Sequence, residues 1–219
     1  MLKFISDSIL DVLFPRRCFG CGLENMALCE ACIGEFPPAP AESGDVTAYA
    51  PFSYRHPPLK KALWALKFEG NTEVARICAR LLYDRIIPLI EEYASYRGVK
   101  MPLLVPVPIS RRRRWARGYN QTECIARELA RLDGGSSFEL FTGALIKTKD
   151  VPPQTTLREK TARMKNIEGC FATKHPDSIN GRDVIVLDDI YTTGATFGEA
   201  KRVLKRARAR TVICVAVAH

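Results

Sequence analysis

Two aspartates, Asp188 and Asp189, stand directly after four apolar residues in the stretch VIVLDDIYTTGAT. The apolar run predicts a buried strand, so both carboxylates are expected at its carboxyl end. Ligands bind at that end of the strands in open α/β sheets. Carboxylates accept hydrogen bonds from ribose hydroxyls and can hold Mg²⁺. The pair therefore predicts a site for a sugar diol, a magnesium ion, or both.

The loop after the aspartates has the composition of a phosphate cradle. Its glycine lets the backbone approach an anion, its backbone N–H groups and hydroxyls donate hydrogen bonds, and a helix expected to begin near Phe197 adds its N-terminal dipole. A ribose 5-phosphate is the simplest ligand that satisfies both the aspartates and the loop. The alternative is an ordinary strand-to-helix turn, which explains fewer of the polar residues. The loop residues are Thr192, Thr193, Gly194, Ala195 and Thr196.

Four cysteines near the N-terminus follow the pattern C-x2-C-x7-C-x2-C. Two C-x2-C turns can complete a tetrahedral shell of four thiolates around Zn²⁺. Such a closed site predicts a structural zinc that stabilises a segment too short to form its own core. A redox C-x2-C is the alternative, although redox motifs occur singly near a βαβ unit. The predicted ligands are Cys18, Cys21, Cys29 and Cys32.

The chain of 219 residues has a formal charge of +9, which favours acidic partners such as nucleic acid. Two stretches concentrate this charge, an arginine run and one face of the last helix. Each either contacts a nucleic-acid backbone or is a solvated surface. Trp115 is the expected stacking residue, whereas Trp64 is expected in the core of an amphipathic helix. The candidate nucleic-acid contacts are Arg111, Arg112, Arg113, Arg114, Trp115, Lys201, Arg202, Lys205 and Arg206.

The elements that position these residues alternate between strands and helices in the second half of the chain, which predicts parallel βαβ units. The apolar runs lack polar alternation, as expected when helices cover both faces of a sheet. An amphipathic helix is expected within the first fifteen residues. Strands are expected at 102–108, 143–148, 183–189 and 211–218, and further helices at 57–68, 71–96 (with a kink or break at Pro88), 120–132 and 198–209.

The stretch VIVLDDIYTTGAT resembles the motif that binds 5-phosphoribosyl-1-pyrophosphate (PRPP) in type I phosphoribosyltransferases. Together with VPVPISRRRRWARGYNQ, PPQTTLREKTARMKNI and the cysteine segment, nearly the whole chain resembles the ComF-type (GntX-like) competence-protein family. Tyr119 stands where that family usually has phenylalanine. The resemblance implies an α/β fold, a type I phosphoribosyltransferase-like parallel sheet flanked by helices, with a small amino-terminal four-cysteine zinc module. We divide the chain into the helix and zinc finger (1–40), a helical hood segment (41–100) and the core (101–219).

The resemblance also implies a role for each part of the site. Asp188 and Asp189 would hold the ribose hydroxyls, and the threonine loop would hold the 5′-phosphate. The arginine-rich segment after the first core strand would bind pyrophosphate, and a later polar segment would form a lid. The pyrophosphate residues are Arg117 and Gly118, and the lid residues are Gln154, Arg163 and Asn166.

Two classes of function remain open. In the first, the protein binds Mg-PRPP and acts in DNA uptake during natural transformation, with single-stranded DNA and other uptake proteins as partners. In the second, it is an active phosphoribosyltransferase of nucleotide or amine metabolism with no DNA role, and the aspartates stabilise a cationic ribosyl centre. The acceptor is not identified by the sequence. We expect no stable membrane insertion, since no apolar run approaches the ~18 residues of a membrane span. We expect a cytoplasmic protein, because Asp7 and Asp11 interrupt the apolar N-terminus and no small-residue cleavage site follows it, unlike in a signal peptide.

Overall fold

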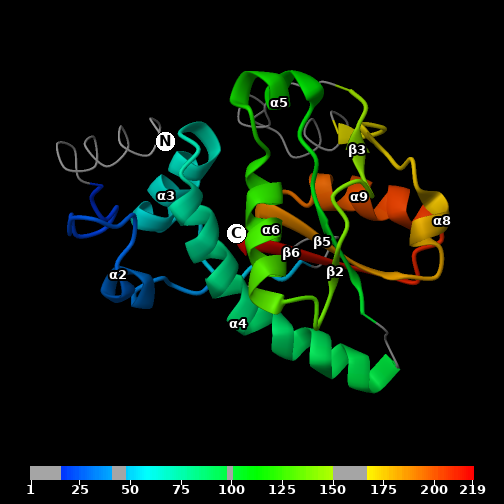
Figure 1. Cartoon of the computed structure of the whole chain (residues 1–219), viewed down its shortest axis with the longest axis horizontal. Coiled ribbons are helices and arrows are strands. Elements are labelled where there is room, and N and C mark those ends of the chain that lie inside the picture. The colour runs from blue at the N-terminus through cyan, green and yellow to red at the C-terminus, as the bar shows by residue number, and fades with distance from the viewer. Residues whose placement is uncertain (1–15, 41–47, 98–100, 150–166) are drawn as a thin grey trace, which may run out of the picture.

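The computed structural model describes residues 16–40, 48–97, 101–149 and 167–219 (Figure 1). Its centre is a four-stranded parallel sheet with the strand order β2-β1-β5-β6. The predicted α/β class with a parallel sheet is confirmed. The strands are β1 (Leu103–Pro106), β2 (Glu139–Leu140), β5 (Asp183–Ile190) and β6 (Thr211–Ala218).

Helices cover both faces of this sheet, which explains why its strands are apolar without alternation. Ile185 and Leu187 of β5 belong to the core under three helices that precede β5 in the chain. Val184 and Val186 belong to the core under α9. The helices are α3 (Pro57–Phe68), α4 (Thr72–Arg97) and α6 (Gln121–Asp133) on the first face, and α9 (Ala195–Arg206) on the second.

Shorter elements surround this sandwich. The expected strand at 143–148 forms only a two-residue strand, which pairs antiparallel with β4 outside the main sheet. The cysteine module contains one short helix, and two more short helices lie between residues 101 and 219. These elements are α2 (Glu30–Gly34), α5 (Arg111–Arg117), β3 (Ile146–Lys147), β4 (Phe171–Ala172) and α8 (Pro176–Ile179).

A segment from the first half of the chain pairs with the last strand. Tyr49 and Phe52 form isolated parallel bridges with Val215 and Ala218 of β6. The backbone N–H of Tyr49 donates to the carbonyl of Cys214 at 2.8 Å, and the N–H of Ala216 donates to the carbonyl of Tyr49 at 2.9 Å. This segment therefore lies along the outer edge of β6.

Two expectations differ from the structure. Helix α4 continues through Pro88, so the helix does not break there. Trp64, expected in the core, is 53% exposed, because Leu63 and Leu66 occupy the buried face of α3. The expected N-terminal helix lies outside the described residues. In the described ranges, no helix combines the length and hydropathy that a membrane crossing requires.

Candidate functional site

The predicted acidic pair lies at the carboxyl end of the central strand β5, and both side chains are buried. One oxygen of Asp188 accepts a hydrogen bond from the hydroxyl of Thr122 at 3.3 Å and another from the backbone N–H of Asp189 at 2.9 Å. Burial, and then repulsion from Asp189, raise the pKa of Asp188 well above its ordinary value. The surroundings of Asp188 thus compensate the charge of its ionised form only poorly.

A chain of polar contacts joins the second aspartate to the predicted pyrophosphate segment. The Gln121 side-chain amide donates to Asp189 at 3.4 Å, and the guanidinium of Arg117 donates to the amide oxygen of Gln121. Gln121 and Thr122 are therefore part of the site, although the sequence analysis did not identify them. Their position at the start of a helix that follows β1 was the available signal, because that helix begins at the ligand-binding edge of the sheet.

The arginine-rich segment after β1 forms the short helix α5. Its N-terminus is capped by Ser110, whose hydroxyl accepts from the N–H of Arg113 at 3.3 Å. Its C-terminus ends at Gly118, which adopts a left-handed conformation with φ 82°. Asn120 then caps α6 and donates to the carbonyl of Val107 at 3.0 Å. Arg117 and Gly118 thus end a short helix just before α6.

The end of α3 forms one wall beside this segment. The hydroxyl of Tyr119 donates to the carbonyl of Leu66 at 2.8 Å. The guanidinium carbon of Arg117 lies 5.3 Å from the centre of the Phe68 ring. The positive charge of Lys67 lowers the pKa of Asp188 and so offsets part of the rise caused by burial and Asp189. Tyr119, which departs from the family pattern, therefore links α3 to the site by its hydrogen bond to Leu66. The sequence alone did not reveal that Lys67 and Phe68 lie next to the site.

The predicted phosphate loop connects β5 to α9. Gly194 is the N-cap of α9 with φ 79°, a left-handed conformation that glycine adopts without strain. The helix begins at Ala195, two residues before the expected start at Phe197. The hydroxyl of Thr193 accepts from the N–H of Ala195 at 3.5 Å. The loop thus brings hydroxyl groups to the N-terminus of α9 beside the acidic pair.

The predicted basic run borders a cleft of about 670 Å³ between α5 and β3. Arg114 and Glu123 both line this cleft and form an ion pair at 2.8 Å. Trp115, on the same helix, is 91% exposed. The cationic side chains that line the cleft are Arg111, Arg112, Arg114, Lys147, Lys149 and Lys174.

The basic face of α9 has mixed surroundings. Arg202 makes two hydrogen bonds of 2.6 Å to Glu199, and Glu199 also accepts from the N–H of Gly169 at 2.9 Å. Lys205 donates to the carbonyl of Ala209 at 3.2 Å. Arg202 and Lys205 thus have protein partners, and Lys201, Lys205 and Arg206 are exposed.

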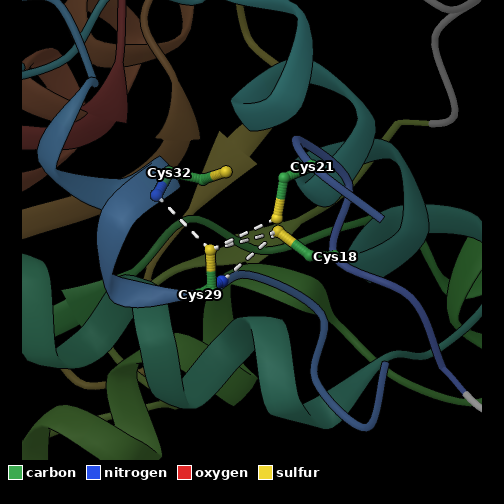
Figure 2. A group of neighbouring side chains, drawn as sticks. All are labelled: Cys18, Cys21, Cys29 and Cys32. Atoms are coloured by element: carbon green, nitrogen blue, oxygen red, sulfur yellow. Dashed lines mark hydrogen bonds between the residues drawn. The ribbon is translucent and has the colours of Figure 1, made fainter. Parts of the chain in front are cut away.

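The four predicted metal ligands lie together, and Figure 2 shows their side chains converging. All four sulfurs lie within 4.8 Å of one another, and Cys29 Sγ lies 3.7 Å from Cys18 Sγ and 3.6 Å from Cys21 Sγ. Tetrahedral zinc with bonds of about 2.3 Å places its sulfurs ~3.8 Å apart. Gly22 has φ 81° in the first turn. The cysteine cluster therefore fits Zn²⁺.

The predicted lid residues Gln154, Arg163 and Asn166 lie outside the described residues. Their role as a lid remains a prediction.

The sequence is similar to DNA utilization protein YhgH of Shigella flexneri, with 30% identity over 201 residues, covering 89% of this chain and 80% of the relative. It is 28% identical to competence protein F of Haemophilus influenzae over 152 residues, covering 68% and 62%. It is 30% identical to competence protein ComFC of Bacillus subtilis over 159 residues, covering 70% and 57%. A mutant hypoxanthine phosphoribosyltransferase from Trypanosoma cruzi, solved with IMP, matches at 15% identity and a TM-score of 0.41, covering 66% of this chain and 63% of that one. No family model matches the chain.

Proposed function

The chain belongs to the family of DNA utilization protein YhgH and competence proteins F and ComFC, and on that premise we propose that it binds Mg-PRPP and acts in DNA uptake. The observation that carries the ligand assignment is the buried acidic pair at the end of β5. The pair lies beside the N-terminus of α9 and is joined through Gln121 to Arg117.

Each half of this site suits one half of the ligand. The carboxylates of Asp188 and Asp189 accept hydrogen bonds from the two ribose hydroxyls, and a bound Mg²⁺ would offset their charge. The threonine loop and the positive end of α9 hold the 5′-phosphate. Arg117 and Gly118 face the pyrophosphate, which a guanidinium matches in charge and geometry. Gln154, Arg163 and Asn166 cover the bound ligand.

The DNA role rests on the names of the relatives and on the distribution of charge. The basic cleft between α5 and β3 and the exposed cations of α9 supply positive charge for a nucleic-acid backbone. The zinc module has a structural role, because four cysteine ligands leave no open position for catalysis.

Calorimetric titration with Mg-PRPP tests the ligand assignment. Asp188→Asn and Asp189→Asn are expected to weaken binding, because each removes a charged acceptor for a ribose hydroxyl or for the magnesium ion. Thr193→Val is expected to cost about 0.5–1.5 kcal/mol of binding free energy through one lost hydrogen bond, and more if its partner is the charged phosphate.

Asp177→Asn, an exposed change on α8, is the matched control and should bind as the wild type does. Absence of Mg-PRPP binding to the wild-type protein would show that the ligand assignment is wrong. Equal binding by the wild type and both Asn variants would show that PRPP binds elsewhere.

An active phosphoribosyltransferase is the second candidate, and the electrostatics around Asp188 favour it. An ionised carboxylate in a buried site stabilises a cationic ribosyl centre more strongly than an exposed one does, because water screens the charge less there. The reaction breaks the bond from ribosyl C1 to pyrophosphate and forms one from C1 to a nucleophile. Release of pyrophosphate in the presence of nucleobases, ammonia or amines would demonstrate this activity, and its absence with each acceptor would favour the binding role.

A further inference from the structure

Two aromatic side chains stand exposed, one turn apart, on the outer face of α3. Trp64 is 53% exposed and Phe68 is 57% exposed. Their ring centroids lie 5.2 Å apart with a tilt of 42° between the ring planes. We call these two side chains the α3 ring pair. Because the buried face of the helix is occupied by aliphatic side chains, the rings are not needed to fill the core.

Positive charge surrounds the α3 ring pair. Lys67 Nζ lies 5.8 Å from the centre of the Phe68 ring, and the Arg117 guanidinium lies 5.3 Å from it. Lys60 and Lys61 are exposed on the preceding turn of the same helix. Glu69 is an exposed acidic neighbour in the chain. The local surface thus combines aromatic faces with an excess of cations.

We propose that the α3 ring pair is a stacking platform for the bases of single-stranded nucleic acid, a location that rests on the DNA role proposed above. Successive bases stack on exposed rings whatever their sequence, while nearby cations contact the phosphates. The unstacked bases of a single strand match the rings, and its phosphates match the lysines. An apolar face of a protein partner would match the rings but would leave the surrounding cations without counter-charges.

The ring pair is connected to the PRPP site by direct contacts. Phe68 contacts Arg117, Arg117 donates to Gln121, and Gln121 donates to Asp189. A strand whose bases stack on Phe68 therefore lies beside the segment proposed to bind pyrophosphate. Trp64 lies one turn further from Arg117 and is not one of the residues in this series of contacts. It is therefore the better position for a test of base stacking.

Two fluorescent oligonucleotides of equal length separate stacking from backbone attraction. One carries thymine bases, and the other is an abasic strand with the same number of phosphates. Trp64→Ala is expected to weaken binding of the thymidine strand roughly 5- to 150-fold, the range of one lost base–ring stack, and to change binding of the abasic strand about twofold or less. Trp64→Phe keeps an aromatic face and is expected to retain most of the affinity.

Leu132→Ala, which truncates an exposed apolar side chain on α6, is the matched control and should leave both affinities unchanged. The proposal is overturned if Trp64→Ala binds both strands as the wild type does, if both strands lose affinity equally, or if the wild type prefers neither strand. A parallel titration of Trp64→Ala with Mg-PRPP should match the wild type. Failure of the wild type to bind PRPP would refute the proposed ligand and leave the comparison of the two strands valid.

Discussion

At the scale of single residues, Asp188 and Asp189 are proposed to favour ligand binding but are expected to lower the stability of the protein without ligand. Burial and Asp189 raise the pKa of Asp188, so folding makes its ionised form less favourable. The folded protein therefore binds the Asp188 proton more tightly than the unfolded chain does. Protonation of Asp188 therefore contributes to the free energy of unfolding below pH 3.8, the ordinary pKa of the carboxyl group. This contribution is lost as the pH rises from 3.8 through the raised pKa that Asp188 has in the folded protein.

Asp188→Asn is therefore expected to stabilise the ligand-free protein at neutral pH. The asparagine oxygen can still accept from Thr122 and from the N–H of Asp189, but it carries no charge. Each kcal/mol gained should raise the melting temperature by about 2–4 °C in a chain of this size. Thermal denaturation of both proteins across a pH series measures the difference, which should shrink toward acidic pH. A lower melting temperature for Asp188→Asn at neutral pH would contradict this expectation.

The sequence predicted those site residues that lie close together along the chain, because a short motif was enough to recognise them. The cysteine ligands lie within fifteen residues of one another, and the aspartates are adjacent. Gln121, Thr122 and Phe68 could not be identified in this way, because they reach the site only through tertiary packing. The exposure of Trp64 was missed for a related reason. Amphipathic spacing shows that a helix has a buried face, but a tryptophan at its margin can lie on either side.

At the scale of elements, strands were easier to predict than the helix of the arginine run. The apolar runs of β1, β5 and β6 are continuous and end near polar residues. Helix α5 has no apolar periodicity, so the hydrophobic pattern did not reveal it. Its signals are the capping residues Ser110 and Gly118, together with the good helix propensity of arginine.

The cysteine module gives a prediction at this scale. Cys29→Ser is expected to remove Zn²⁺ and loosen residues 16–36, while the parallel sheet stays folded, because one lost ligand opens a closed four-sulfur site. Elemental analysis of the purified protein measures the metal, and hydrogen exchange locates the loosening. Cys124→Ser, which lies outside the cluster, is the matched control and should retain zinc. A wild-type protein without zinc, purified in the absence of chelators, would contradict the assignment.

At the scale of the whole molecule, packing joins parts that lie far apart in the sequence. One hydrophobic core contains Cys18 and Leu28 of the cysteine module, Leu63 of the hood segment, and Val217 of the last strand. The domain boundaries near residues 40 and 100 remain predictions. The family resemblance suggested them, and a resemblance in sequence does not reveal which apolar surfaces meet across a boundary.

The pairing of Tyr49 and Phe52 with β6 has a consequence for aggregation. A fragment of residues 101–219 would lack this covering segment, and α3 and α4 with it, and would expose the edge of an eight-residue strand, including the carbonyl of Cys214 and the N–H of Ala216. Unpaired strand edges serve as templates for pairing between molecules. We expect the fragment to self-associate in light scattering and size-exclusion chromatography, whereas residues 48–219, which retain the covering segment, should do so much less. A monodisperse, monomeric 101–219 fragment would show that another part of the core protects this edge.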